Sequence, residues 1–365
     1  VSQAWDTTPD ATSTYRVNSS KDYLVTASNS TGTVTYTAKN KGEHGNAIDI
    51  RLNLNEGEEL PAGIGVTPST GIVAKASGAT NPDIQDIIDV LGDEWFQIFV
   101  APYVDTTNLN AMKTELDARN ASTVMMDGLY IATKDGTLSA LSTFGSGRNN
   151  RFESIPEAAD VISSPMELAA AIGGQVAAEG STDPARPFQT LELAGIVPAP
   201  KAERFTYAER NSLLFDGIAT INVDTAGVVH IERMITTYQK NAVGGDDVAY
   251  LDVNTILSLM YIRWDWVNYI RGKYPRHKLA DDGVRAAAGQ PIITPKIGKA
   301  EAVARFRTWE DIGIVENIDQ FKNDLICQRS SSDVNRLEWT LPPDLVNQFR
   351  VGATVIQFLL QSPTA

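Results

Sequence analysis

Two adjacent carboxylates are the first candidates for chemistry in this sequence, because Asp246 and Asp247 follow a pair of glycines. Paired aspartates hold divalent metal ions in viral polymerases, where both carboxylates meet the same cations. Here the run lies just before Tyr250 and an expected helix start near Asp252, a position typical of a turn. We therefore predict a turn. A metal-dependent enzyme that uses Asp246, Asp247 and another carboxylate is the less favoured alternative.

The other residue types that commonly carry catalysis are scattered along the chain. His44, His230 and His277 are far apart, and none lies in a zinc-binding HExxH pattern. There is no phosphate-binding glycine-lysine loop, and the Phe-Gly-Ser-Gly run at 144–147 lacks the spacing of a GxSxG nucleophile elbow. We interpret that run as a flexible turn, and we predict no catalytic residue, no metal, no cofactor and no enzymatic activity.

The composition indicates a folded protein with little affinity for nucleic acid or membranes. The chain has 365 residues, of which 42% are hydrophobic, which is enough for two or three domains. Its 31 basic and 45 acidic residues give a net charge of -14, which repels phosphate backbones. No apolar run approaches the ~20 residues of a membrane-spanning helix. We expect neither nucleic acid as a partner nor insertion into a membrane.

The cysteine content and the start of the chain give two further expectations. The single cysteine, Cys327, cannot form a disulfide within the chain, which fits synthesis in the cytoplasm. The chain begins with Val-Ser-Gln-Ala-Trp, without a starting methionine or a signal peptide. We therefore expect that an N-terminal piece is missing.

Changes in sequence pattern divide the chain into three expected domains. Residues 1–78 are rich in Ser, Thr, Asn and Gly, with β-type alternation at 33–37 and 48–52, and indicate a peripheral β-rich domain. Residues 79–200 alternate helix and strand patterns, and indicate an α/β layer with a partly parallel sheet. Residues 201–365 form the expected C-terminal core domain. The predicted fold class is α/β (α+β), with a β-rich peripheral domain and a mixed-sheet α/β core.

Hydrophobic spacing predicts individual elements within these domains. Asn81 is expected to cap a helix that ends at Gly92. The other expected elements of the middle domain are a strand over 95–100, a helix along Leu109, Met112 and Leu116, a strand over 128–133 and a helix over 165–178. Those of the last domain are a hairpin of 217–223 and 227–233, an apolar helix over 253–271 that stops at Gly272, and strands over 325–329, 336–341 and 351–360.

Basic residues gather just after the long apolar helix, at Arg271, Lys273, Arg276, His277 and Lys278. In a chain of net negative charge, a solvated helix end or a protein interface explains this cluster better than a nucleic-acid site does. Burying Arg276 or Lys278 without a partner would cost too much, so we expect these two residues to lie at an interface.

The order and spacing of motifs from Glu209 onward resemble the C-terminal half of Mu-like contractile phage tail sheath proteins. The motifs are ERNSLL at 209–214, GVVHIER at 227–233, TTYQ at 236–239, DVAYLD at 247–252, YPRHKLA at 274–280, DG at 282–283, WE at 309–310, VEN at 315–317 and FK at 321–322. Upstream, GEHGN at 42–46 and the Pro-Tyr pair at 102–103 fit the family more loosely. The resemblance identifies the chain as a member of this family.

What the resemblance implies is a mechanical function. Sheath subunits assemble with one another as stacked six-membered rings around a rigid tail tube, together with baseplate and tail terminator proteins. Contraction of the sheath then drives the tube through the host envelope. Terminal arms add strands to a neighbour's sheet, and Val351, Val355 and Phe358 on the final expected strand are the candidates here. The implied location is the virion, as part of the phage tail, after synthesis in the cytoplasm of the bacterial host.

The resemblance also implies which faces meet the partners. The helix over 253–271 and the segment 274–280 are expected to face the tube and neighbouring subunits, although an ordinary core helix is an equal alternative for 253–271. The β-rich domain is expected to project outward, because its polar surface suits solvent. An adhesin or receptor-binding module in residues 1–78 is the alternative function, but it does not explain the second half of the chain.

Overall fold

The structure is a computed structural model of the chain, and it describes residues 24–50, 62–63, 65 and 77–358. It has two compact units, Val1–Pro82 and Asp83–Ala365, and each is described by itself. Helices and small sheets are mixed along the chain, which confirms the predicted α+β class. Within the described ranges, no helix is long and apolar enough to cross a membrane.

The first unit contains a β-hairpin, whose second strand is the alternating run predicted at 33–37. β1 (Val25–Ser30) pairs antiparallel with β2 (Thr33–Ala38). Thr31 and Gly32 in the turn between them have φ angles of 48° and 81°, the left-handed conformation that a two-residue hairpin turn requires. The predicted strand over 48–52 is wrong for residues 48–50, which form no strand, and residues 51–52 lie outside the described part of the chain.

A short 3-10 helix, η1 (Glu43–Ala47), explains both this error and a second one. The Ile48 amide donates back to the Gly45 carbonyl, so the alternating residues follow a helical turn and do not enter a ladder. Asn81 does not cap a helix, because its Oδ1 accepts from the Glu43 amide at 2.8 Å. The predicted cap is therefore wrong, and the helix begins later in the chain.

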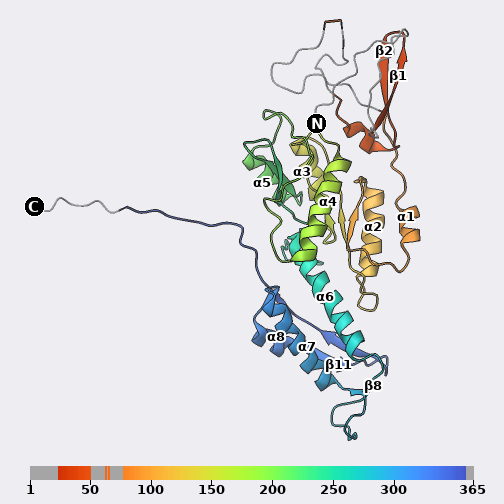
Figure 1. Cartoon of the computed structure of the whole chain (residues 1–365), viewed down its shortest axis with the longest axis vertical. Helices are drawn as coiled ribbons and strands as arrows, with labels where there is room; N and C mark the ends of the chain where they lie inside the picture. Colours follow the sequence, from red (N-terminus) through yellow and green to blue (C-terminus); the bar gives the residue numbers. More distant parts are fainter. Residues whose placement is uncertain (1–23, 51–61, 64, 66–76, 359–365) are drawn as a thin grey trace, which may run out of the picture. The chain divides into compact units, whose positions relative to one another are not determined.

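The second unit begins with an α/β layer around a small parallel sheet (Figure 1). Its strands are β3 (Ile98–Val100), β4 (Leu129–Ile131) and β5 (Glu153–Ser154), in that order and all parallel. Its helices are α1 (Gln85–Leu91), α2 (Thr106–Arg119), α3 (Leu138–Ser146) and α4 (Pro165–Thr182). The parallel sheet and the helices α2 and α4 were all predicted from hydrophobic spacing, and the structure confirms them.

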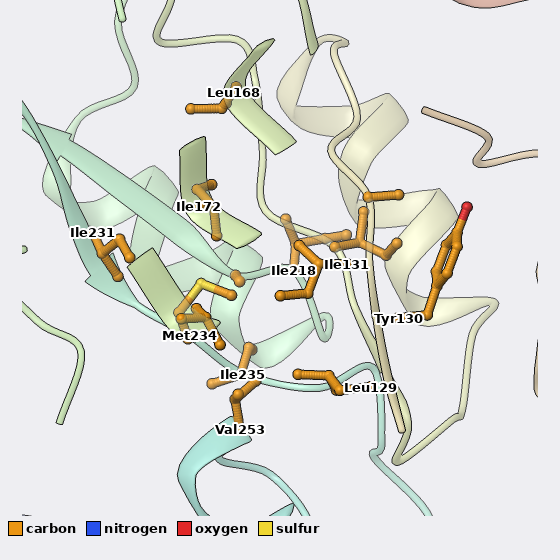
Figure 2. Close-up of a cluster of buried hydrophobic side chains, with 14 of the residues drawn as sticks. Leu129, Tyr130, Ile131, Leu168, Ile172, Ile218, Ile231, Met234, Ile235 and Val253 are labelled. Carbon is orange, nitrogen blue, oxygen red and sulfur yellow. The ribbon is translucent and has the colours of Figure 1, made fainter. Parts of the chain in front are cut away.

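The central strand β4 is completely covered, as expected when helices pack on a parallel sheet. Its three residues are at most 1% exposed. Figure 2 shows them in the same apolar cluster as Leu168 and Ile172 of α4 and Ile218, which precedes β6. Leu109, Met112 and Leu116 of α2 are also buried in this cluster, so the helix face predicted from the sequence is the face that packs.

The Phe-Gly-Ser-Gly run is not a flexible turn, because Gly145 and Ser146 belong to α3. α5 (Tyr207–Phe215) contacts α3, and the carbonyl oxygen of Asp216 at its end lies 2.2 Å from where a Cβ of Gly145 would be. Glycine is required at this position for close packing of two backbones. The turn prediction was wrong because the need for glycine at position 145 comes from contact with Asp216, which is 71 residues later in the sequence.

The predicted hairpin follows α5 and is confirmed. β6 (Thr220–Val223) pairs antiparallel with β7 (Val229–Arg233). In the connecting turn, Asp224 Oδ1 accepts from the amides of Ala226 and Val228, both at 2.8 Å. The Ala219 amide, just before β6, donates to the Ile155 carbonyl beside β5, so the hairpin is joined to the parallel sheet.

The last part of the unit has its own apolar cluster, arranged around one long helix, α6 (Val253–Lys273). The elements that follow α6 are β8 (Lys278–Leu279), β9 (Ile292–Ile293), α7 (Pro295–Asp311), β10 (Val315–Glu316), α8 (Ile318–Asp324), β11 (Ile326–Arg329), β12 (Leu337–Thr340) and β13 (Asp344–Leu345). The strands predicted over 325–329 and 336–341 are confirmed as the antiparallel pair β11 and β12. Gly272 does not stop α6, because the helix continues through it to Lys273.

α6 serves both apolar clusters of the second unit. Ile256 and Met260 in its first half pack in the cluster around β4. Ile262 and Trp266 in its second half pack with Phe306 of α7 in the later cluster. Figure 1 shows the helix running from the α/β layer to α7.

Candidate interaction surfaces

The long helix α6 is a core helix along most of its length. Ten of its residues are buried, including the charged Asp265. Asp265 accepts two hydrogen bonds from the Arg305 guanidinium and one from Trp309 Nε1 at 2.7 Å. An exposed Trp264, at 43%, is the main apolar side chain of the helix that is open to solvent. Within the chain, the core alternative for 253–271 therefore describes this helix, apart from Trp264, Asn268 and the exposed C-terminal end, while contact with the tube stays a prediction.

The basic cluster lies at the end of α6 and in the turn that follows it, but its members differ in their environment. Arg271, Arg276 and His277 are exposed. Lys278 is exposed too, and its Nζ donates to Gln290 Oε1 at 2.9 Å. Lys273 instead forms an ion pair with Glu301 of α7 at 2.7 Å. The structure thus brings the five predicted residues together, and all five are exposed, although Lys273 also makes a contact within the chain.

Glu301 organises this end of the helix. It accepts hydrogen bonds from Lys273 and from the hydroxyl groups of Tyr269 and Tyr274. Partial burial, followed by the hydrogen bond to Glu301, raises the pKa of Tyr274 to about 12. The Glu301 hydrogen bond also raises the pKa of Lys273, so its ammonium stays charged. These contacts fix the base of the turn from which Arg276 and Lys278 project.

A groove of about 780 Å³ runs along α6. It is lined by Met260, Arg263 and Trp266 of α6, by residues 120–127 in part, and by the consecutive residues 336–339. Side chains alternate between the two faces of a strand, so a groove that touches consecutive residues faces the backbone edge of β12. In the described part of the chain, β12 pairs with β11 alone, so this edge is open.

Charged residues on the groove wall are mostly paired. Arg263 Nη1 lies 2.6 Å from Asp127 Oδ1, and Arg336 lies 2.9 Å from Glu338. Burial raises the pKa of Asp127, while the Arg263 charge opposes that shift. With these charges neutralised in pairs, aromatic and aliphatic side chains such as Trp339 dominate the remaining lining. The sequence did not point to this groove, because its walls come from four separated segments.

The C-terminal segment is the second predicted interaction surface, and the structure leaves it open. Val351, Val355 and Phe358 are 82%, 84% and 82% exposed. The predicted strand over 351–360 is not formed within the chain, since residues 351–358 have no ladder partner and 359–360 lie outside the described residues. The exposed backbone groups of this segment can bond to water, but a β-strand is defined by its ladder, so a strand here requires a partner edge. We call residues 351–358 the C-terminal arm.

The two aspartates considered for metal binding follow the predicted turn and do not lie in it, because the turn is at residues 242–243 and Asp246 forms an antiparallel β-bridge with Lys240. The Asp247 carboxylate accepts a hydrogen bond from the Tyr238 hydroxyl at 2.6 Å, and Asp246 is exposed. The Tyr238 hydrogen bond holds the pKa of Asp247 below its usual range. Across residues 24–50, 62–63, 65 and 77–358, no group of three or more His, Cys, Asp or Glu side chains has the arrangement of a metal site.

The α/β layer contains a buried pair of carboxylates that no sequence pattern indicated. Glu157 and Asp160 are at most 1% exposed, and Glu157 Oε2 accepts from the Ala159 and Asp160 amides. Among the described residues, Glu157 Oε1 has no hydrogen-bond partner. Burial, and then the charge of Asp160, raise the pKa of Glu157 to about 8. The nearby Arg210 is held by Glu232 at 2.8 Å, so it does not pair with Glu157.

We expect Glu157→Gln to change how stability depends on pH. The pKa of Glu157 is higher in the folded protein than its unfolded value of about 4.5. The stability contributed by the protonated carboxyl is therefore fully present below pH 4.5, and it is lost as the pH rises through about 8. A neutral amide cannot ionise, so Glu157→Gln should become more stable than the wild type as the pH is raised from about 5 to about 9. Urea unfolding across that range measures the difference.

The matched control for this experiment is Glu192→Gln, at an exposed position. Its stability should follow that of the wild type at every pH. A Glu157→Gln protein whose pH profile stays parallel to the wild type would show that Glu157 ionises normally in the folded state.

Comparison with known proteins gives a consistent result along most of the chain. The family profile described as phage tail sheath protein central domain matches residues 77–237, and that of the phage tail sheath C-terminal domain matches residues 246–358. The Mu-like prophage FluMu tail sheath protein of Haemophilus influenzae is 38% identical over 340 residues, which are 93% of this chain and 69% of the relative.

Solved structures share the fold at much lower identity. The sheath tail protein of Desulfitobacterium hafniense matches with a TM-score of 0.50 and 15% identity, over 88% of this chain and 82% of that one. The sheath tail protein Lin1278 of Listeria innocua matches with a TM-score of 0.53 and 11% identity, over 87% and 64% of the two chains. With matches to both sheath domains and a relative that is 38% identical, the chain belongs to the phage tail sheath family.

Proposed function

We propose that this chain is the subunit of a contractile phage tail sheath, which polymerises around the tail tube and contracts to drive the tube through the host cell envelope. The observation that carries the proposal is the 38% identity to a Mu-like prophage tail sheath protein over 93% of the chain. In this function the subunits form stacked six-membered rings and meet the tube, the baseplate and the tail terminator. The protein acts as a structural element of the virion, without catalysis, nucleic-acid binding or membrane insertion, after synthesis in the host cytoplasm.

We propose that three regions divide this work. Residues 1–78 form the peripheral part that projects outward, residues 79–200 form the α/β part, and residues 201–365 form the core with the tube-facing and subunit contacts. The exposed basic cluster supports the proposed tube and subunit contacts of residues 201–365, because its charge is positive whereas the overall charge of the chain is -14. Arg271, Arg276, His277 and Lys278 would face an acidic surface on the tube or on a neighbouring subunit.

The C-terminal arm is proposed to add a strand to a neighbouring subunit. Val351, Val355 and Phe358 are exposed apolar side chains, and an open apolar strand on a free monomer favours aggregation. The open edge of β12 offers backbone groups for such a strand, and the groove beside it offers apolar lining around Trp266 and Trp339. β-augmentation of this kind holds chains together through main-chain hydrogen bonds while their bodies remain free to rotate.

Electron microscopy of negatively stained protein at high concentration, with and without tube protein, tests the proposal directly. Regular hollow tubes of the width of a contracted sheath, or decoration of the tube, support it. Light scattering gives the polymer content independently. A protein that stays monomeric under every condition, with tube present, would contradict the sheath function.

Charge reversal of the basic cluster is expected to impair assembly without unfolding the protein. In the double variant Arg276→Glu/Lys278→Glu, attraction to an acidic partner becomes repulsion, so assembly should fall about tenfold or more at low salt. Both side chains are exposed, so the melting temperature should change little. Light scattering measures the assembly, and circular dichroism measures the folding.

The control is Lys201→Glu/Lys240→Glu, which makes the same change in net charge at two other exposed positions. It should assemble like the wild type. Equal assembly of both double variants would remove the basic cluster from the interface.

A further inference from the structure

The root of the C-terminal arm is joined to the fold by an ion pair. Asp252, the residue before α6, accepts hydrogen bonds from two arginines, Arg350 at 2.9 Å and Arg233 of β7 at 3.2 Å. As the N-cap residue of α6, Asp252 has the type of side chain that usually caps a helix, but it makes no cap hydrogen bond. Its carboxylate therefore serves the two arginines and not the helix.

The guanidinium of Arg350 is largely enclosed. Its side chain is 16% exposed, whereas Val355, five residues later, is 84% exposed. Burial lowers the pKa of Arg350, while the charge of Asp252 opposes that shift. In the described part of the chain, Arg350 Nε has no hydrogen-bond partner. Enclosing a cation is costly unless a partner compensates it, and Asp252 is the carboxylate that does so.

Packing alone does not hold this segment in place. A cavity of about 70 Å³ lies between residues 345–348 and the start of α6, where its lining includes Asn254 and Ser258. The Val346 amide donates to the Ile314 carbonyl at 3.0 Å, the Phe349 carbonyl accepts a long hydrogen bond of 3.5 Å from Gln189 Nε2, and the ion pair of Arg350 follows. Beyond Arg350, the arm residues are exposed as far as Phe358.

We propose that Asp252 and Arg350 form a clasp that fixes the root of the C-terminal arm, so that only residues beyond 350 are free to reach a partner. Asp252 precedes α6 and also binds Arg233 of β7, so a force applied to the arm would act on both of these core elements. Arg350 is a positioning residue, since it sets where the free arm begins. The part of this inference that concerns a partner rests on the proposed sheath function.

Trypsin tests the clasp on the free protein, because it cleaves after arginine and requires the side chain to enter its specificity pocket. In the wild type the enclosed Arg350 should be cut slowly, although the arm that follows it is open. Asp252→Asn removes the charge that holds Arg350, so cleavage between Arg350 and Val351 should accelerate about tenfold, the ratio expected for losing one charged hydrogen bond. Mass spectrometry of the released C-terminal peptide measures the rate, with cleavage after the exposed Arg285 as the internal reference.

Two further variants separate the clasp from general loosening. Arg233→Ala removes the competing arginine and leaves the Arg350 contact, so cleavage after Arg350 should be unchanged or slower. Arg350→Lys keeps the charge and the cleavage site but loses the reach of the guanidinium, so cleavage after position 350 should be faster than in the wild type. In each case the melting temperature is recorded, and a clasp effect appears as faster cleavage at 350 with an unchanged rate at Arg285.

The inference is overturned if wild-type protein is cut after Arg350 as fast as after Arg285, or if Arg233→Ala accelerates cleavage as much as Asp252→Asn does. Assembly is measured in parallel, and Asp252→Asn is expected to assemble more slowly because the arm root is no longer held. Failure of the wild type to assemble with tube protein would count against the sheath function, while the cleavage rates would still decide whether the clasp exists.

Discussion

Replacing Asp265 with alanine is expected to lower the free energy of unfolding by about 3 kcal/mol or more, the usual cost of removing one partner of a buried ion pair. Asp265 lies on the buried face of α6, with its side chain 8% exposed. It joins two helices, because both Arg305 and Trp309 belong to α7. Its loss would leave the Arg305 charge and the Trp309 indole N–H without their acceptor in the second apolar cluster.

Urea unfolding monitored by tryptophan fluorescence measures this effect, since Trp266 and Trp309 lie in the same cluster. Asp265→Asn keeps the shape and one acceptor but not the charge, so its loss should be smaller. The control is Asp319→Ala, which removes an ion pair with Lys322 from the surface, where Asp319 is 91% exposed. That variant should lose about 0.5 kcal/mol or less. Equal losses at the two positions would mean that Asp265 does not join α6 to α7.

Gly145→Ala is the second substitution for which we expect a large effect, a loss of about 3 kcal/mol in unfolding free energy. The added methyl carbon would lie 2.2 Å from the Asp216 carbonyl oxygen and 2.7 Å from Ile218 Cγ1. The oxygen belongs to the backbone, which cannot rotate away as a side chain can, so α3 and α5 would have to separate. The separation would also disturb Gln239, whose Nε2 donates to the Gly145 carbonyl at 3.0 Å.

The control for this change lies two residues further along the chain. A Cβ at Gly147 would meet its nearest atoms at 3.4 and 3.5 Å, close to ordinary van der Waals contact, and the φ angle there suits any residue. Gly147→Ala should therefore change the stability by less than about 1 kcal/mol. Thermal unfolding of both variants decides the matter, and a Gly145→Ala protein as stable as Gly147→Ala would contradict the close approach of the two helices.

Local sequence patterns predicted much of this fold because the forces behind them are local. The apolar residues of α2 recur at Leu109, Met112 and Leu116, and this spacing places them on one face of a helix whatever lies opposite. The turn at Asp224 likewise depends on hydrogen bonds within five residues. Such elements appear in the structure at nearly the predicted positions.

The errors come from contacts between distant segments. Asn81 has the chemistry of a helix cap, but Glu43, almost forty residues earlier, uses its side chain. Gly145 lies in a Gly-Ser-Gly run that is typical of a loop, but it packs against the backbone of Asp216 at the end of α5. The ion pair of Lys273 with Glu301, 28 residues later, also could not be predicted, although Lys273 remains exposed in the basic cluster. A hydrophobic or charge pattern along the chain contains no information about these partners.

The candidate surfaces were predictable to different degrees for the same reason. The arm and the basic turn are continuous in sequence, so Val351 to Phe358 and Arg276 to Lys278 could be identified directly. The groove and the clasp are assembled from separated segments, and neither Trp339 nor Asp252 has a local pattern that indicates its neighbours. The buried Glu157 is a similar case, since carboxylates are so rarely enclosed that sequence reasoning places them at the surface.

The position of α6 has a thermodynamic consequence for the whole second unit. Because one half of the helix supplies side chains to the cluster around β4 and the other half to the cluster around Phe306, neither cluster is closed without it. Unfolding of the later cluster would remove the neighbours of Trp266 and expose the second half of α6. The first half of the same helix is packed in the cluster around β4 through Ile256 and Met260. We therefore expect the two clusters to unfold in a single cooperative transition, in which a change in the stability of one cluster also changes that of the other.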